Sequence, residues 1–416
     1  MPLPNIGTRP QKNPFSPGGN YYKELEQACK IGASPDRVGL LLRKQGLAPQ
    51  IATEIAIQCD LRKRAEAKFG TQAKKMLFTR PGLEQATRQC VASIHAKRLA
   101  EVNVHFVADL GCGLGTEAIA FAKAGIQVLA LELDDYTASC AKHNLAEYPQ
   151  ATVKIADVTK ISMQTLADAG VDALFADPAR RGPRGRLIDP STWSPALPLV
   201  LNWRNSIPNL GVKVAPGLHY SDIPSDAEAL WVSVDGAVVE TSLWFGDLRK
   251  RAGRAALCIR GGQYSTFPIY TDSPNAPAAR AEVGNSVAEW IGEVDGAILR
   301  AGGLAQWVES WPGATLVHEG IAYATSEIAP PAVAAKFGRF WKVHSVLPLN
   351  AKKIKRRLAD LGVGTLEIKK RGIQIDPAAF RKRVLPKPTG NLSATLFLTR
   401  AQVTGKSKHV AILAFG

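Results

Sequence analysis

The stretch DLGCGLGT, residues 109–116, decides the fold of this chain of 416 residues. It follows the apolar segment VHFVADL (104–110), which has the composition of a buried strand, and it leads into the helical segment TEAIAFAKAG (116–125). Glycines at a strand-to-helix turn let the backbone approach a ligand closely. A dinucleotide-binding turn, G-x-G-x-x-G, would need glycine where this chain has Thr116. The turn departs from that pattern and carries an acid, Asp109, two residues before its first glycine.

Apolar strand-like segments alternate with helical segments beyond this turn. The expected strands are 104–110, 126–133, 152–157, 171–177 and 211–216, and the expected helices between the first of them are 116–125 and 137–148. This alternation predicts a parallel, doubly wound α/β sheet. Further on, two strand-like segments meet at Asp235-Gly236, which predicts a hairpin. A helix is expected near 284–298.

The acid before the glycines completes the pattern D-x-G-x-G-x-G, and here the sequence resembles the class I S-adenosylmethionine-dependent methyltransferases. The cofactor carboxylate can meet backbone N–H groups of the turn, and Asp109 can meet its ammonium group. Glu132, at the end of the second strand, can accept both ribose hydroxyls. Asp157 can accept from the adenine amine beside the apolar Val158. The expected S-adenosylmethionine-binding residues are Asp109, Gly111, Gly113, Gly115, Glu132, Asp157 and Val158.

The fourth strand ends at Asp177-Pro178-Ala179-Arg180-Arg181, in the crevice where open α/β sheets carry out their chemistry. Base methyltransferases have D/N-P-P-aromatic here, which accepts an exocyclic amine and stacks the flipped base. This chain keeps Asp-Pro but has Ala and Arg after it, and a guanidinium can also stack on a base or contact phosphate. The candidate catalytic residues are Asp177, Pro178, Arg180 and Arg181. The alternative is that the arginines form a solvated basic loop.

The Asp-Pro-x-Arg pattern is also similar to that of the RNA uracil-5 methyltransferases, which attack the base with a cysteine placed after the fifth strand. In this chain that place reads VKVAPGLHYSD (212–222) and has no cysteine. Cys258 is the only cysteine beyond Asp177, and it lies in an apolar strand pattern. Methylation of a nitrogen is therefore favoured, because an amine beside a carboxylate can attack a sulfonium methyl group directly.

The positive charge of the chain is concentrated in its last fifth. The net charge is +16, from 52 Lys and Arg against 36 Asp and Glu. Residues 336–416 hold 18 basic and 3 acidic residues, which leaves a net charge of only +1 for the other 335 residues. An appended polyanion-binding module would explain this distribution. A solubility surface or an acidic protein partner is the alternative. The residues expected to bind nucleic acid, which the resemblance described next implies to be RNA, are Lys352, Lys353, Lys355, Arg356, Arg357, Lys369, Lys370, Arg371, Arg381, Lys382 and Arg383.

The run from VLPLNAKKIKRRLADLG through DPAAFRKRV (346–384), with the closing strands, resembles the THUMP-like domain at the C-terminus of a bacterial methyltransferase family. The segments 289–307 and 318–327 resemble the middle region of that family. This resemblance covers roughly residues 60–416 and implies a class I methyltransferase fused to an RNA-binding module. The expected organisation is a flexible arm (1–20), a helical region (21–100), a Rossmann-like methyltransferase domain with a middle region (101–335) and a basic THUMP-like domain (336–416).

Other features of the sequence bear on the cellular compartment, on membrane spanning and on metal binding. The six cysteines form no C-x-x-C pair, which favours reduced thiols in a cytoplasm. No stretch is long and apolar enough to cross a membrane, and the seven histidines have no metal-ligand spacing. The sequence predicts a cytoplasmic methyltransferase, without metal, that methylates a base nitrogen of tRNA or rRNA. The alternatives are an RNA-binding protein that has lost catalysis, and a methyltransferase for a protein or a small molecule.

Overall fold

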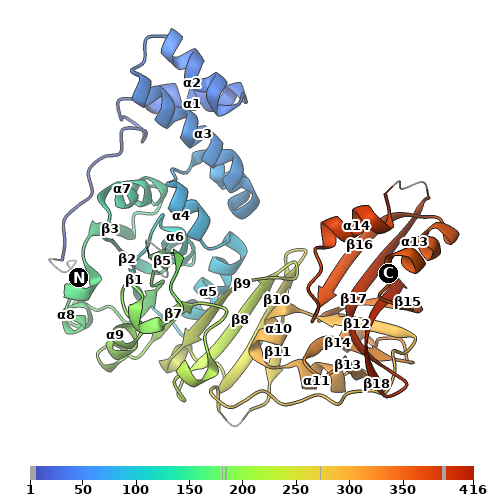
Figure 1. Cartoon of the computed structure of the whole chain (residues 1–416). Coiled ribbons are helices and arrows are strands. Elements are labelled where there is room, and N and C mark those ends of the chain that lie inside the picture. Colours follow the sequence, from blue (N-terminus) through green and yellow to red (C-terminus); the bar gives the residue numbers. More distant parts are fainter. Residues whose placement is uncertain (1–5, 180, 183–184, 272, 387–389) are drawn as a thin grey trace. The chain divides into compact units, whose positions relative to one another are not determined.

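The computed structural model in Figure 1 describes residues 6–179, 181–182, 185–271, 273–386 and 390–416. The chain forms two compact units. Unit 1 consists of Met1–Ala215, Asp226–Glu228 and Ser242–Arg251, and unit 2 of Pro216–Ser225, Ala229–Thr241 and Ala252–Gly416. The boundary expected at residue 335 lies inside unit 2, so the four-part division stays a prediction.

Parallel strands form the centre of unit 1, in the order β3-β2-β1-β4-β7. The strands are β1 (Phe106–Leu110), β2 (Gln127–Glu132), β3 (Ala151–Ile155), β4 (Ala173–Ala176) and β7 (Leu210–Val214). The connecting helices are α6 (Thr116–Lys123), α7 (Asp135–Asn144), α8 (Met163–Asp168) and α9 (Leu197–Asn202). Every residue of β1 is buried, as expected for a strand covered on both faces. The predicted doubly wound sheet is confirmed.

The region before the sheet is helical, as predicted. Its helices are α1 (Tyr22–Ile31), α2 (Pro35–Lys44), α3 (Pro49–Phe69), α4 (Arg80–Gln85) and α5 (Gln89–Glu101). Residues 81–100 do not form one continuous helix, because the chain leaves α4 at Ala86 and starts α5 at Gln89. The Lys68 ammonium explains the end of α4, since it donates hydrogen bonds to the carbonyl oxygens of Leu83, Glu84 and Ala86.

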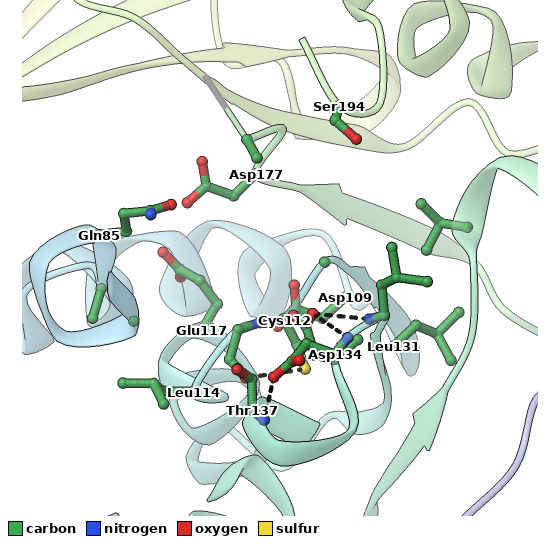
Figure 2. A pocket seen from close by; sticks show the side chains of 18 of the residues that line it. Gln85, Asp109, Cys112, Leu114, Glu117, Leu131, Asp134, Thr137, Asp177 and Ser194 are labelled. Carbon is green, nitrogen blue, oxygen red and sulfur yellow. Dashed lines mark hydrogen bonds between the residues drawn. The ribbon is translucent and has the colours of Figure 1, made fainter. Parts of the chain in front are cut away.

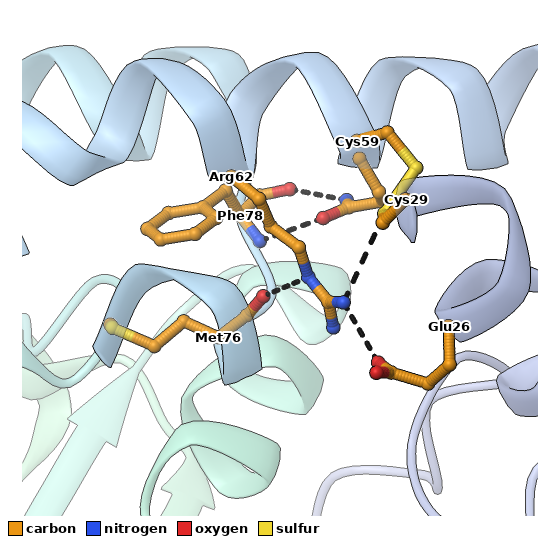
Figure 3. The surroundings of a disulfide bond; sticks show 7 residues. Glu26, Cys29, Cys59, Arg62, Met76 and Phe78 are labelled. Atoms are coloured by element: carbon orange, nitrogen blue, oxygen red, sulfur yellow. Dashed lines mark hydrogen bonds and ion pairs between the residues drawn. A yellow bond between two sulfur atoms is a disulfide. The ribbon is translucent and has the colours of Figure 1, made fainter. Parts of the chain in front are cut away.

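A disulfide joins α1 to α3, between Cys29 and Cys59 (Figure 3). The expectation of reduced thiols is therefore wrong for this pair. The two cysteines are 30 residues apart in the chain, and only the packing of α1 against α3 brings them together. Beside the bond, Arg62 donates to Glu26 at 2.8 Å and to the Met76 carbonyl at 2.9 Å, which ties both helices to the segment leading into α4.

The expectation of a loosely attached N-terminal arm is wrong for its described residues, 6–20. Thr8 and Ile155 exchange two backbone hydrogen bonds, of 3.0 and 2.7 Å, at the end of β3. The Asn13 amide donates to the Ser139 hydroxyl at 2.9 Å, and the Phe15 side chain is fully buried. Burial of apolar and amide groups against α7 holds the segment on unit 1, although its composition is typical of a loop.

Short elements complete the chain. The strands β5 (Arg181–Gly182) and β6 (Gly185–Arg186) form an antiparallel pair. The 3-10 turns are η1 (Gly70–Lys75), η2 (Val158–Lys160), η3 (Pro190–Thr192), η4 (Trp203–Asn205), η5 (Tyr220–Asp222) and η6 (Gly246–Leu248). The strands β8 (Glu228–Val234) and β9 (Ala237–Trp244) meet at Asp235-Gly236, where both residues have positive φ (50° and 84°), as expected for the predicted hairpin.

Unit 2 contains the hairpin of β10 (Gly253–Arg260) and β11 (Gln263–Ile269) and a seven-stranded sheet in the order β13-β14-β12-β15-β18-β17-β16. The strands of that sheet are β12 (Trp290–Val294), β13 (Thr315–His318), β14 (Ile321–Ser326), β15 (Gly338–Pro348), β16 (Val363–Arg371), β17 (Leu392–Val403) and β18 (Lys406–Phe415). Its helices are α10 (Gly296–Ala301), α11 (Leu304–Glu309), α12 (Ala332–Ala335), α13 (Ala351–Asp360) and α14 (Pro377–Val384). After residue 339 the chain alternates between strands and helices, from β15 through α13, β16 and α14 to β17 and β18, whereas the helix expected near 284–298 is replaced by β12 and α10.

Candidate active site

A cavity of about 590 Å³ lies in unit 1 at the carboxyl ends of β1, β2 and β4 (Figure 2). A volume of this size is typical of a small-molecule site. Of the residues predicted from the sequence, those that line it are Asp109, Gly111, Gly113, Glu132, Asp157, Val158 and Asp177. The segment 79–87, from α4 and the linker after it, closes another part of the wall. The fold therefore brings most of the predicted cofactor-binding residues, together with Asp177, into one cavity.

The glycine turn has the backbone that the sequence suggested. Gly111, Gly113 and Gly115 all have positive φ, at 88°, 55° and 79°. Gly113 has open space where a side chain would be, so its backbone is accessible from the cavity. Gly115 does not line the cavity. A Cβ there would meet the Leu145 side chain at 3.1 Å, so this glycine lets α6 begin close to α7.

Asp109 lies at the floor of the cavity on β1 and is 1% exposed. Within the described part of the chain, its Oδ2 atom has no hydrogen-bond partner. Burial and then the negative charges of Glu117, Asp177 and Glu132 raise the pKa of Asp109 well above its ordinary value. A buried carboxylate oxygen that needs a donor fits the ammonium group of S-adenosylmethionine.

Glu132 is fixed by the backbone around it. Its Oε2 accepts from the Gly113 N–H at 2.9 Å, and its Oε1 accepts from the N–H groups of Leu133 and Asp134 at 2.8 and 3.0 Å. These bonds orient the carboxylate at the end of β2, where the remaining lone pairs can accept the ribose hydroxyls.

Asp157 and Val158, which were predicted to bind the adenine, both line the cavity. The Asp157 Oδ1 accepts from the hydroxyl and the N–H of Thr159, at 2.6 and 3.0 Å, and Lys160 lies 3.2 Å from its Oδ2. The hydroxyl and then the N–H of Thr159, followed by Lys160, lower the pKa of Asp157. Val158 is 8% exposed and offers an apolar wall. These residues fit the adenosine half of the cofactor.

Asp177 follows β4 and has a partner that was not predicted. The Lys213 ammonium, on β7, donates to the Asp177 Oδ2 at 2.7 Å and to the Thr87 hydroxyl at 2.8 Å. Glu117 and Gln85 also line this end of the cavity, and Figure 2 shows both on the side of Asp177. A signal for Lys213 existed, because it is the one charged residue of the apolar segment GVKVAP (211–216).

The rest of the Asp-Pro-Ala-Arg-Arg segment is described only in part. Pro178 is buried but does not line the cavity. Ala179 forms two backbone hydrogen bonds with Ser194, of 2.7 and 3.0 Å, so these two residues are held together at the edge of the cavity. Arg180 lies outside the described residues. The backbone of Arg181 lies in β5, and the structure describes nothing of its side chain.

Most of the predicted RNA-binding residues are exposed. The exposed Lys and Arg residues of α13 and α14 are here called the basic face. They are Lys352, Lys353, Lys355, Arg356, Arg381, Lys382 and Arg383. Of the other predicted residues, Lys370 is exposed and Arg357 is half-buried. The two helices pack against each other, and Asn350, Lys352, Asp376 and Arg383 line a groove of about 640 Å³.

Two of the predicted RNA-binding residues instead hold unit 2 together. The Lys369 ammonium and the Arg371 guanidinium bind Glu293 of β12 at 2.8 and 3.0 Å. They also lie over the rings of Trp341 and Tyr323, respectively. Burial would raise the pKa of Glu293, but the hydrogen bonds and charges of the two bases lower it. The prediction of free, RNA-facing charges is therefore wrong for these two residues, because each is committed to an internal ion pair.

Two sequence families match parts of the chain. The family described as RNA cap guanine-N2 methyltransferase matches residues 104–186, and the family described as THUMP domain-like matches residues 338–414. A 23S rRNA (uracil(1939)-C(5))-methyltransferase of Acidithiobacillus ferrooxidans is 32% identical over 111 residues, which are 26% of this chain and 25% of that protein. The two family matches include the glycine turn and the THUMP-like domain.

Longer similarity extends over most of the chain. Two proteins of Mycobacterium tuberculosis, both described as uncharacterized S-adenosylmethionine-dependent methyltransferases, are 30% identical over 362 residues, covering 84% of this chain and 93% of each relative. The crystal structure of a presumed methyltransferase from Porphyromonas gingivalis W83 has a TM-score of 0.72 at 21% identity and covers 94% of this chain and 97% of its own. The fold is therefore that of a class I S-adenosylmethionine-dependent methyltransferase. The chain belongs to the bacterial family of these enzymes that carries a C-terminal THUMP-like domain.

Metal binding and membrane spanning have no support in the described part of the chain. Within the residues that the structure describes, no group of three or more His, Cys, Asp or Glu side chains could hold a metal ion. In the same residues, no helix is both long and apolar enough to span a membrane.

Proposed function

We propose that this methyltransferase modifies a base nitrogen of tRNA or rRNA in the cytoplasm. The observation that carries the proposal is the combination of a carboxylate, Asp177, at the cofactor pocket with a separate cluster of exposed Lys and Arg side chains on a THUMP-like domain. Contacts of exposed Lys and Arg side chains with phosphate groups give affinity for RNA without specificity for particular nucleobases. The RNA-related names of one matching family and of one relative support the same substrate class.

S-adenosylmethionine supplies an electrophilic methyl group on a sulfonium sulfur. Asp109, Glu132 and the Asp157–Val158 wall would hold its amino-acid, ribose and adenine parts. Asp177 would accept a hydrogen bond from the target amine and direct the nitrogen lone pair at the methyl carbon. Arg180 and Arg181 would hold the base or the phosphate beside it, and Pro178 would shape the loop. The basic face would bind the RNA backbone.

A nitrogen is a better target for these residues than a carbon. Methylation of uracil C5 needs a cysteine nucleophile, and Cys112 is the one cysteine among the described residues lining the pocket. Burial and the charges of Asp109 and Glu132 raise the pKa of the Cys112 thiol well above its ordinary value, which opposes formation of the thiolate. The uracil-methylating relative therefore supports an RNA substrate more than it supports C5 chemistry in this chain.

Label transfer to RNA tests the proposal. The purified protein is incubated with methyl-tritiated S-adenosylmethionine and total RNA from cells that lack the gene, and the RNA is then digested to nucleosides. We expect label in one N-methylated nucleoside, identified by mass spectrometry, and no transfer to RNA from cells that carry the gene. Intact cofactor binding without transfer to RNA would contradict the proposal.

A second function is favoured by one observation, the departure of Asp-Pro-Ala-Arg from the D/N-P-P-aromatic pattern. A protein that binds RNA and cofactor but does not transfer the methyl group would also have a basic face. A protein or small-molecule methyltransferase would transfer label to lysate protein or to the soluble fraction, and neutralising the basic face would not change its turnover. The same labelling experiment, with all three fractions counted, separates these outcomes.

A further inference from the structure

Side chains of α3 hold one wall of the cofactor pocket, and a disulfide holds α3 to α1. The pocket-lining segment 79–87 begins directly after Phe78, whose backbone is paired with the Gln58 side chain of α3. The Gln58 amide donates to the Phe78 carbonyl oxygen at 2.6 Å, and the Phe78 N–H donates to Gln58 Oε1 at 3.1 Å. Gln58 is 3% exposed, and Cys59 follows it directly in the chain. The disulfide therefore lies next to the side chain that fixes the start of the wall.

Arg62 makes a second contact of this kind, about one turn further along α3 (Figure 3). Its Nε donates to the Met76 carbonyl oxygen at 2.9 Å, and its Nη1 donates to Glu26 of α1 at 2.8 Å and lies 4.0 Å from the Cys29 sulfur. Arg62 is 4% exposed, and within the described part of the chain its Nη2 has no hydrogen-bond partner. One buried guanidinium thus joins α1, the disulfide and the segment before the wall, and it retains an unused donor.

The segment held by α3 is also connected to the glycine turn. The Asn144 side chain of α7 pairs with the N–H and the carbonyl oxygen of Leu77, at 2.8 and 3.0 Å, and donates to the Leu114 carbonyl oxygen at 3.0 Å. Leu114 lines the pocket, as does Thr79, whose side chain caps the start of α4. Residues 76–78 therefore connect α3 to the wall and to the turn, so a displacement of α3 changes the shape of the cavity.

The disulfide is accessible to small thiols. Cys29 and Cys59 are half-buried, whereas Cys112 and Cys140 are buried. In a cytoplasm, thiol pools keep most cysteines reduced, and the disulfides found there are usually transient and redox-sensing. A positive charge beside a sulfur favours its thiolate, so Arg62 makes Cys29 the better leaving group in an exchange reaction.

We propose that Gln58 and Arg62 are positioning residues for the pocket wall, and that thiol–disulfide exchange at Cys29–Cys59 thereby controls the affinity for S-adenosylmethionine. A thiolate of a small dithiol attacks the Cys59 sulfur, the S–S bond breaks, and the electron pair leaves on Cys29. The second thiol then displaces Cys59, so that the dithiol becomes a disulfide and its two protons pass to Cys59 and to solvent. The Cys29 thiolate accepts hydrogen bonds from Arg62 and weakens the hold of that residue on Met76, which loosens the wall.

Cofactor titration of the two redox forms tests this role, which rests on the proposed function only for the reducing compartment. The full chain is equilibrated with reduced or oxidised dithiothreitol, and the state of Cys29 and Cys59 is established by alkylation and mass spectrometry. Calorimetry then gives the Kd for S-adenosylmethionine. We expect the Kd of the reduced form to be about fivefold or more above that of the oxidised form, as for a typical coupling between two sites. Equal Kd values would overturn the proposal, and so would a bond that neither forms nor breaks under these conditions.

The same coupling must appear in the equilibrium of the bond itself, because linkage between two sites is reciprocal. The fraction of protein that carries the Cys29–Cys59 bond is measured over mixtures of reduced and oxidised dithiothreitol, with and without saturating S-adenosylmethionine. The cofactor should shift the equilibrium constant toward the disulfide by the factor that separates the two Kd values. A bond that only stabilises the packing of α1 on α3 would show no shift, and that result would overturn the proposal.

Matched variants identify the cysteines that carry the effect. Cys29→Ser with Cys59→Ser should bind the cofactor as the reduced wild type does and should not respond to dithiothreitol. Cys90→Ser, which removes an exposed cysteine outside the disulfide, should behave as the wild type does. A response that persists in the double variant would assign the effect to other cysteines and overturn the proposal. The two wild-type measurements decide the outcome even if a variant does not fold, and neither contains RNA, so failure of methyl transfer to RNA leaves them valid.

Discussion

The cofactor pocket of unit 1 and the basic face of unit 2 use charge in opposite ways. In the pocket, Asp109 and Lys213 are almost fully buried, and the Lys213 ammonium contacts Asp177 and Thr87 directly. On the basic face, the Lys and Arg side chains are exposed, and the ion pair of Arg356 with Asp360, at 4.0 Å, joins two exposed groups. The energy of a buried charge depends strongly on each neighbouring group. An exposed charge is screened by solvent and salt, and it contributes mainly through the total charge of the surface around it. Single substitutions should therefore matter in the pocket, and only combined ones on the basic face.

The largest effect is expected at Asp177. Asp177→Ala removes the group that would accept the target amine, and we expect methyl transfer to RNA to fall by about 10²-fold or more. Transfer is measured with tritiated S-adenosylmethionine under saturating cofactor, and cofactor affinity is measured in parallel by calorimetry. A variant that binds the cofactor and still transfers methyl groups at the wild-type rate would remove Asp177 from the mechanism.

Asp109 should affect cofactor binding and its pH dependence. Asp109→Asn removes a charge-assisted hydrogen bond to the ammonium group, so we expect the Kd for S-adenosylmethionine to rise about 10- to 100-fold. Because the pKa of Asp109 is raised in the free protein, affinity in the wild type should increase as pH rises through that value and the carboxyl ionises. The variant should lose this dependence when calorimetry is repeated over a pH series. The same slope in both proteins would contradict the assignment.

The basic face should respond to several changes together. Replacing Lys352, Lys353, Lys355 and Arg356 by Gln should weaken binding of total tRNA by about tenfold or more at moderate salt. It should also reduce the slope of log K against log salt by about 0.7 for each RNA phosphate that the protein no longer neutralises. Fluorescence anisotropy over a salt series measures both quantities.

The internal ion pair of unit 2 provides the matched control for the basic face. Lys369→Met with Arg371→Met also removes two positive charges, but it leaves the carboxylate of Glu293 without its partners. We expect a lower Tm and an unchanged salt slope. If this double substitution changed the salt slope as much as substitution of two basic-face residues does, Lys369 and Arg371 would not differ from the basic face in their contribution to RNA binding.

The smallest effect is expected from the segment that pairs with the end of β3. Gly7 has φ of 61°, and a Cβ there would overlap the carbonyl oxygen of Ile155, next to the adenine wall of the pocket. Gly7→Ala should raise the Kd for S-adenosylmethionine by a few-fold, measured by calorimetry. Gly32→Ala is the control, because Gly32 has a similar φ of 67° and no atom within 4 Å of the added carbon. Equal effects of both substitutions would mean that contact at the adenine wall is unimportant.

Local patterns predicted the sheet and the cofactor turn because the required information is contiguous in the chain. The acid and the glycines follow directly at the end of the first strand. A parallel sheet then gathers the ends of its strands at one edge. The elements after residue 339 were predictable for the same reason, since each apolar period is complete within its own segment.

Pairings between distant residues could not be predicted in this way. Lys213 meets Asp177 and Thr87, which are 36 and 126 residues away in the chain. Glu293 meets its two bases across more than 70 residues, so a count of charges includes Lys369 and Arg371 with the exposed ones. The disulfide and the docking of residues 6–20 likewise depend on packing between elements. Composition describes each residue type but does not identify its partner.

The ion pairs of Glu293 have a consequence for the shape of the sheet in unit 2. In the strand order, β15, β18 and β17 lie between β12 and β16, so a flat sheet would separate these two strands by about 19 Å. Ion pairs of 2.8 and 3.0 Å across that interval require the sheet to roll toward a partly closed barrel. Its interior holds Tyr323, Trp341 and Phe397. The middle region and the THUMP-like segment thus build one barrel wall, and cutting the chain at Lys336 would open it instead of releasing a module.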